Sequence, residues 1–256
     1  MRILITNDDG YQSRGIGVLA AAVAAAGHDV VVAAPDRDQS GCGAGIGQWH
    51  MDEHIDVQDV ELEDAPDVRA IAVRGTPALA VFAANLGAFG DPPELVVSGI
   101  NPGLNTGRAT LHSGTVGAAL TAANLGLSGL AVSQDYGDPM LWATAADLAV
   151  EAVTWLEDAP GRTVLNLNVP NTDPAAVRGI RWANLAPFGS FRAALADRTD
   201  GRLQMEFREV DDELPADSDT ALVFAGYAAV SSLVGIRVGP PLAEADGVRP
   251  PVPRSA

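Results

Sequence analysis

The sequence contains no lysine, so all of its positive side-chain charge comes from 16 arginines, apart from its four histidines. This absence excludes a Walker-type phosphate loop and Schiff-base chemistry, because both require a lysine amine. Acidic residues number 33 and the formal net charge is −17, which argues against binding to nucleic-acid polymers or anionic membranes. A small phosphorylated substrate is compatible with this charge if a cation neutralises the phosphate.

Cysteine is also nearly absent, since Cys42 is the only one among 256 residues. A single thiol can form neither an intrachain disulfide nor a cysteine-rich zinc site. No uninterrupted apolar run is long enough to span a bilayer, and the first residues lack the basic segment of a signal peptide. We therefore expect a cytoplasmic protein. An apolar content of 47% is enough for a sizeable folded core.

The first ten residues predict a buried strand that ends in two carboxylates. Residues 1–5 are mostly apolar, and Thr-Asn-Asp-Asp-Gly follows at once, with Asp8 and Asp9 adjacent. Buried charges are costly unless they are paired or bound to a cation, and open parallel sheets bind ligands beyond the carboxyl ends of their strands. The segment indicates either a metal or phosphate site, or a solvated turn in which Asp9 caps the next helix.

Strand and helix patterns alternate through the first two thirds of the chain. Short apolar runs predict strands, and Ala-rich stretches with apolar residues on one face predict helices between them. Such units give a parallel sheet with right-handed crossovers and helices on both faces. We expect strands at 1–5, 30–34, 70–73, 95–97, 130–133 and 164–169, and helices at 16–26, 77–86, 111–126 and 140–156. The predicted fold class is α/β, with a Rossmann-like, mostly parallel sheet in residues 1–177.

Loops of small and polar residues follow two more of the predicted strands. Ser40 and a Gly-rich stretch at 41–47 come after the second strand, and Asn101 and Asn105 come after the strand at 95–97. The Gly-rich stretch is not a dinucleotide fingerprint, because no helical pattern clearly follows it. Three such loops at one edge of a sheet favour a functional site.

The helix predicted after these loops begins with Ser113-Gly114-Thr115. This start either binds an anion through free backbone N–H groups or simply caps the helix.

Beyond residue 177 the alternation stops. Segments that favour strands at 179–183, 203–210 and 227–233 are separated by acidic loops. We expect a β-rich extension over 178–238, in the form of an arm or hairpin that packs on a partner subunit. The last segment, 239–256, contains five prolines and predicts a poorly ordered tail.

Taken together, these motifs resemble the SurE family of metal-dependent nucleotidases and phosphatases. The resemblance covers most of the chain in the family's order. It rests on ILITNDDG (3–10), APDRDQSG (34–41), RGTPA (74–78), LVVSGINPGLNTG (95–107), HSGTVGAAL (112–120), LNLNVP (165–170) and DSDTALVFAGYAAVSSL (217–233).

The resemblance implies a metal site and an oligomer. The metal, Mg²⁺ or Mn²⁺, would be held by Asp8, Asp9, Ser40 and Asn101, all of which offer the oxygen ligands that hard cations prefer. It would activate a water for hydrolysis of phosphomonoesters, by resemblance nucleoside 5′- or 3′-monophosphates, with Asp8 or Asp9 as general base. A swapped C-terminal arm would build dimers or tetramers. The implied phosphate-binding residues are Asn7, Gly41, Asn105, His112, Ser113, Gly114 and Thr115.

The sequence departs from the family pattern around the substrate. The loop at 42–47 lacks the family's usual polar residues, and His112 replaces a customary tyrosine. His112 either supplies phosphate contacts or the acid for the leaving group, or it is a partly buried structural residue. Two alternatives to ordinary nucleotidase activity follow. One is a catalytically weakened relative that binds metal or ligand or serves as an assembly subunit, and the other is a phosphatase for a different specialised metabolite.

Overall fold

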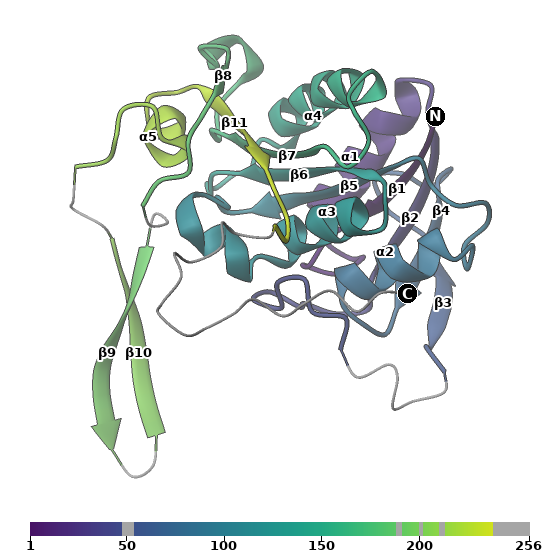
Figure 1. Ribbon diagram of the computed structural model, residues 1–256, viewed down its shortest axis with the longest axis horizontal. Helices are drawn as coiled ribbons and strands as arrows, with labels where there is room; N and C mark the ends of the chain where they lie inside the picture. Colours follow the sequence, from purple (N-terminus) through teal and green to yellow (C-terminus); the bar gives the residue numbers. More distant parts are fainter. Residues whose placement is uncertain (48–53, 188–190, 200–201, 210–212, 238–256) are drawn as a thin grey trace, which may run out of the picture.

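The computed structural model describes residues 1–47, 54–187, 191–199, 202–209 and 213–237. These residues form a nine-stranded sheet with helices on both faces, and a two-stranded hairpin that projects from it (Figure 1). The α/β class predicted from the sequence is confirmed. Within the described residues, no helix combines the length and hydropathy needed to cross a bilayer.

The main sheet contains the strands β1 (Arg2–Thr6), β2 (Asp29–Pro35), β3 (Val57–Val60), β4 (Arg69–Val73), β5 (Leu95–Pro102), β6 (Ser128–Gln134), β7 (Val164–Val169), β8 (Ile180–Trp182) and β11 (Ala228–Leu233). The hairpin consists of β9 (Phe191–Thr199) and β10 (Arg202–Glu209). The α-helices are α1 (Arg14–Ala25), α2 (Pro77–Asn85), α3 (Gly114–Asn124), α4 (Trp142–Glu157) and α5 (Asp219–Phe224). Two short 3₁₀ helices are η1 (Gly107–His112) and η2 (Pro174–Ala176).

The strand order is β3-β4-β2-β1-β5-β6-β7-β11-β8. From β4 to β7 every pair is parallel, whereas β3 and β11 run antiparallel to their neighbours β4 and β7. The first strand, β1, lies between β2 and β5. Because neighbouring parallel strands end at the same edge, the loops that follow β1, β2 and β5 meet there.

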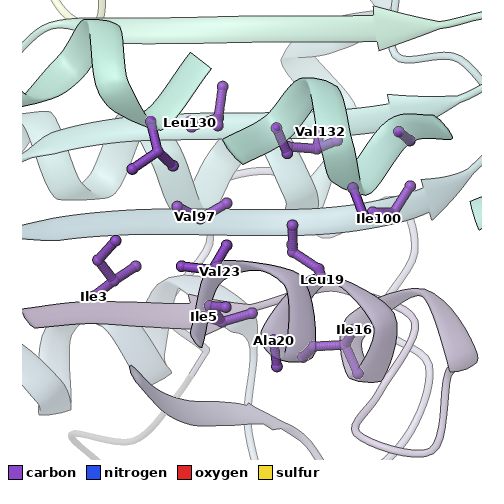
Figure 2. Packing of buried hydrophobic residues seen from close by; sticks show 14 of the residues in the cluster. Ile3, Ile5, Ile16, Leu19, Ala20, Val23, Val97, Ile100, Leu130 and Val132 are labelled. Atoms are coloured by element: carbon purple, nitrogen blue, oxygen red, sulfur yellow. The ribbon is translucent and has the colours of Figure 1, made fainter. Parts of the chain in front are cut away.

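The side chains of β1 alternate between two apolar layers, as the period of a strand requires. Ile3 and Ile5 belong to the cluster that includes α1 and α4, whereas Leu4 belongs to the cluster that includes α2 and α3. Figure 2 shows Leu19 and Val23 of α1 against these strands. Each such buried side chain contributes about 1.5–3 kcal/mol. Helices cover both faces of the sheet, and so a binding site can form only at the ends of the strands.

Residues 178–238, predicted as a β-rich extension, divide between two places. β11 pairs with β7, and β8 pairs with β11, so both strands complete the main sheet. Ala228, Ala229 and Val230 are buried, which explains why this segment joins the core. The hairpin β9–β10 stands away from it (Figure 1). The tail predicted at 239–256 lies outside the described residues.

Several element bounds differ from the predicted ones. β5 continues to Pro102, because it resumes pairing with β6 after an irregularity between Ser98 and Asn101. The helix predicted from residue 111 begins at Gly114, since the hydroxyl of Ser113 accepts the N–H of Val116 and caps it there. β9 and α5 were not predicted from the sequence, and β3 lies in a stretch, 52–68, whose acidic, irregular sequence indicates a surface hairpin or loop.

Candidate metal and phosphate site

Asp8 follows β1 and is held by the first turn of α3. Its Oδ2 accepts the backbone N–H of Gly114 at 2.9 Å, and its Oδ1 accepts the hydroxyl of Thr115. The residue is 2% exposed. A carboxylate is stabilised at a helix N-terminus by the unpaired N–H groups and the helix dipole. The orientation of the Asp8 carboxylate is therefore fixed by hydrogen bonds to both of its oxygens.

Glycine at position 114 is required by this approach. A Cβ there would lie 2.7 Å from Cβ of Asp8 and 2.7 Å from the sulfur of Cys42. The side chain of Cys42 thus lies against the start of α3. Burial, with the nearby charge of Asp8, raises the pKa of the Cys42 thiol to about 11. A thiol that stays protonated at neutral pH is a poor nucleophile.

Asp9 is only partly satisfied by the protein. Its Oδ2 is buried and has no hydrogen-bond partner among the described residues. Burial raises its pKa from 3.8 to about 7, and the negative charges of Asp8 and Asp38 add to the effect. No ion pair within the described part of the chain involves these three carboxylates. A bound cation would supply the missing positive charge, and so the residues fit a metal site.

The alternative in which Asp9 caps the next helix is wrong. α1 begins at Arg14, and its N-cap position is occupied by Ser13. Three residues lie between Asp9 and that cap, so its carboxylate remains available at the sheet edge.

Ser40 is joined to the carboxylates through its neighbours in the loop after β2. The N–H of Gln39 donates to the carbonyl oxygen of Asp8 at 2.7 Å, which fastens this loop to β1. The hydroxyl and the N–H of Ser40 both hydrogen-bond to Asp38 and lower its pKa, the N–H at 2.7 Å. Ser40 itself is exposed at the rim of the site.

Asn101 approaches from β5. Its Oδ1 lies 3.5 Å from the hydroxyl oxygen of Thr115, which in turn contacts Asp8. Its Nδ2 donates to the carbonyl of Gly103 at 2.7 Å, and this bond fixes the orientation of the amide. Thr115 therefore links Asn101 to Asp8 at this edge of the sheet, whereas Ser40 hydrogen-bonds to Asp38 at the rim.

Other predicted residues hold the loops. Asn7 bonds twice with Gly10 and shapes the turn after β1, and Ser113 caps α3. Gly41 is exposed with a φ of 85°, a left-handed conformation that favours glycine. The side chain of His112 is exposed, which overturns its interpretation as a partly buried structural histidine.

The Gly-rich loop at 41–47 is attached through its backbone. The N–H of Gly43 donates to the carbonyl of His112 at 3.1 Å, and the hydroxyl of Thr76 donates to the carbonyl of Gly45 at 2.6 Å. A Cβ at Gly117 would overlap the carbonyl of Gly43, so the loop lies directly on α3. Residues 43–45 thus pack closely without contributing a polar side chain to the site.

Asn105 is held away from β1 by two asparagines that the sequence analysis missed. Asn168 accepts the N–H of Asn105 at 2.8 Å and donates to its carbonyl at 3.0 Å, and Asn166 donates to the same carbonyl at 2.9 Å. The side chain of Asn105 donates to Ser133 at 2.9 Å. Asn166 and Asn168 are two residues apart in a buried strand and hence share a face. The spacing of these two polar residues in an apolar strand was the sequence signal by which they could have been found.

A third residue that sequence reasoning missed is Asp219, which is 0% exposed. Its carboxylate accepts the N–H groups of Gly107 at 2.8 Å, Ala186 at 2.9 Å and Thr220 at 2.9 Å. It thereby joins the start of α5 to the loop that follows β5. The C-terminal part of the chain supports this loop through α5.

Comparison with known proteins shows which family this chain resembles. The model of the family described as survival protein SurE matches residues 3–188. A relative from Chloroflexus aggregans, named 5′-nucleotidase SurE, is 37% identical over 239 residues, which cover 90% of this chain and 92% of the relative. Another of that name, from Stenotrophomonas maltophilia, is 40% identical over 189 residues, covering 72% and 70%.

The fold agrees as well. The crystal structure of the SurE protein from Aquifex aeolicus superposes with a TM-score of 0.76 at 28% identity, and the match covers 91% of this chain and 93% of that one. With the family model matched over residues 3–188 and relatives of this similarity, the chain belongs to the SurE family.

Proposed function

We propose that this chain is a divalent-metal-dependent phosphomonoesterase that hydrolyses nucleoside 5′- or 3′-monophosphates. The observation that carries the proposal is the adjacent pair Asp8 and Asp9, one fixed by two donors and the other with a buried oxygen that has no partner among the described residues. The names of the relatives from C. aggregans and S. maltophilia support the substrate class.

Asp8, Asp9, Ser40 and Asn101 would hold Mg²⁺ or Mn²⁺. Two carboxylates, a hydroxyl and an amide carbonyl are oxygen ligands, which these hard cations prefer. When bound, the cation supplies a Lewis acid for the phosphoryl group and lowers the pKa of a coordinated water.

The protein's own groups divide the remaining work. Asp8 has both oxygens engaged by α3, which fixes the orientation of its carboxylate. Asp9 has an oxygen without a partner in the described residues, which suits a general base for the attacking water. We assign to His112, which is exposed beside the Gly-rich loop, the role of protonating the leaving oxygen. Gly114 and Thr115 act as positioning residues for Asp8.

The test is phosphate release from adenosine 5′- and 3′-monophosphates and a panel of other phosphomonoesters. We expect turnover with Mg²⁺ or Mn²⁺ that chelator abolishes. Asp9→Asn should lower kcat at least about hundredfold, whereas Asp59→Asn, which changes an exposed aspartate of β3, should not. Activity that survives chelation, or full activity in Asp9→Asn, would rule out the mechanism.

A second candidate is a weakened relative that binds metal or ligand without turning it over. It is favoured by residues 43–45, which contribute only backbone, and by the N–H of Gly114, which already bonds to Asp8. Metal binding by calorimetry together with no turnover on any phosphomonoester would support it. Turnover on a non-nucleotide alone would instead indicate a specialised metabolite as substrate.

Self-association and location belong to the same proposal. The hairpin β9–β10 projects from the core in Figure 1, which suits an arm that joins subunits into a dimer or tetramer. Light scattering of the full chain and of a chain with the hairpin shortened tests this role. A cytoplasmic location is consistent with nucleotide substrates.

A further inference from the structure

The loop over residues 135–141, which follows β6, begins beside the candidate metal site. Asn101 of β5 pairs with Ser133 of β6, and the N–H of Gly103 donates to the carbonyl of Gln134 at 2.7 Å. The carbonyl of Gly103 also accepts a hydrogen bond from the side-chain amide of Asn101. Asp135 and Tyr136 are the next residues of the chain, so they lie just outward of a predicted metal ligand.

Strand geometry gives the scale of this separation. Asp135 and Tyr136 follow two and three residues after Ser133, the partner of Asn101. With strands about 4.8 Å apart and at most about 3.3 Å per residue, their Cα atoms lie within about 8 Å and about 11 Å of that of Asn101. A phosphate bound beside Asn101 carries a leaving group that extends from the strand ends. A nucleoside is long enough to reach Tyr136 from there.

This loop is held in one shape by hydrogen bonds. Asn171 accepts the N–H of Leu141 at 2.8 Å and donates to the carbonyl of Pro139 at 3.0 Å. The buried side chain of Gln134 donates to Asn171 at 3.1 Å and to the carbonyl of Leu141 at 3.0 Å. The backbone that carries Tyr136 is therefore fixed before any ligand arrives.

Tyr136 is 73% exposed at the start of this fixed loop. Its N–H donates to Oδ1 of Asp135 at 3.0 Å, and its hydroxyl has no hydrogen-bond partner in the described part of the chain. A tyrosine ring on a fixed backbone offers a large surface at a small cost in conformational entropy. Bases stack on such rings with little dependence on their identity.

We propose that Tyr136 is the stacking residue for the base of a nucleoside monophosphate whose phosphate binds at the metal site, and this subsite rests on the function proposed above. Tyr136 binds the leaving group and takes no part in the chemistry. Asp135 positions it by accepting its N–H. A substrate without an aromatic base gains nothing from Tyr136.

The experiment compares two substrates across three variants. Phosphate release from adenosine 5′-monophosphate and from glycerol 3-phosphate, which lacks a ring, is measured with Mn²⁺ for Tyr136→Ala, Tyr136→Phe and Leu86→Ala. Leu86 is 71% exposed but lies at the C-terminal end of α2, at the opposite edge of the sheet. We expect Tyr136→Ala to raise KM for the nucleotide about tenfold and leave its kcat unchanged. The KM for glycerol 3-phosphate should not move, and Tyr136→Phe and Leu86→Ala should behave as the wild type.

Failure of the subsite and failure of the proposed function give different results. If Tyr136→Ala raises KM equally for both substrates, or leaves both unchanged, the subsite is overturned while the phosphatase stands. If the wild type hydrolyses nothing, calorimetry with adenosine 5′-monophosphate and Mn²⁺ decides the subsite. Binding that weakens in Tyr136→Ala but not in Tyr136→Phe supports it, and no binding, or equal binding by all variants, overturns it.

Discussion

The hydroxyl of Thr115 donates a hydrogen bond to Oδ1 of Asp8, and 107 residues separate the two in the chain. The same hydroxyl oxygen lies 3.5 Å from Oδ1 of Asn101. One small side chain at the start of α3 thus contacts two of the predicted metal ligands, which come from β1 and β5. Partners of this kind set the direction of the groups that bind a metal.

Thr115→Val should weaken metal binding, because it keeps the shape of the side chain and removes the donor. The buried carboxylate of Asp8 then keeps only the N–H of Gly114. We expect a loss of about 10–100-fold in Mn²⁺ affinity, measured by calorimetry. Thr115→Ser retains the hydroxyl and serves as the control. Equal affinity in the valine and serine variants would show that the hydroxyl does not orient Asp8.

The stability of the metal-free protein should fall as pH rises, because of Asp9. Its pKa is raised from 3.8 to about 7 by burial and neighbouring negative charge, so the folded state binds a proton that the unfolded state has lost. The stabilising contribution is complete below about pH 4 and disappears as pH rises through about 7. With chelator present, Asp9→Asn should therefore raise Tm more at pH 8 than at pH 4. A difference in Tm independent of pH would contradict the raised pKa.

Metal should reverse this trend, since only the deprotonated carboxylate of Asp9 binds a cation well. Thermal unfolding with added Mn²⁺ is expected to show a larger rise in Tm at pH 8 than at pH 5. In Asp9→Asn the rise should be small at both values.

Gly117→Ala should impair activity although alanine is a better helix former than glycine. Its Cβ would overlap the carbonyl of Gly43 and push the loop at 41–47 off α3. We expect kcat/KM to fall at least about tenfold, because a small misplacement of site residues is costly. Gly161→Ala is the matched control, since the nearest atom to its Cβ would be 3.8 Å away. Unchanged kinetics in Gly117→Ala would mean that the loop shifts without consequence.

Asp219→Asn should destabilise the fold. The carboxylate accepts three backbone N–H groups and is fully buried, and an amide presents N–H groups of its own to some of these donors. We expect a loss of about 2–3 kcal/mol, which corresponds to a fall in Tm of roughly 5–10 °C. Asp217→Asn changes a carboxylate that accepts from the exposed Asn184 and should shift Tm far less. Similar Tm values for the two variants would argue against the anchoring role.

The periodicity of apolar residues, together with the capping residues at the ends of helices, was sufficient to predict much of the fold. β7 has the bounds that its apolar run predicts, Val164–Val169, and Thr76 caps α2 as the Thr-Pro pair indicates. These features could be predicted because they depend on residues that are close together in the sequence. β9 was missed because its apolar run, residues 193–196, is mostly alanine, which is depleted in strands. β5 was predicted too short because its last residues pair only across an irregular register with β6.

For the site, the sequence indicated candidate residues but not the contacts that hold each of them. Asp8 and Asp9 at the end of a core strand were visible at once. The partners of Asp8 could not be read from sequence, because they come from a helix more than a hundred residues away. Asn166 and Asn168 were visible as a polar pair in an apolar strand, yet only the packing of the loop after β5 shows that they bind Asn105.

The position of β1 in the interior of the sheet, between β2 and β5, has a consequence for folding. During synthesis β1 can pair with β2 early, but its other edge stays open until Leu95–Ser98 has been made. At ribosomal rates that interval lasts several seconds, during which an apolar strand edge is exposed to other chains. The surroundings of Asp8 and Asp9 also form only after α3 has been synthesised. A truncated or misfolded chain therefore cannot assemble them. A measurement of metal binding would thus show whether the sheet has folded completely, as well as whether the site is ready for catalysis.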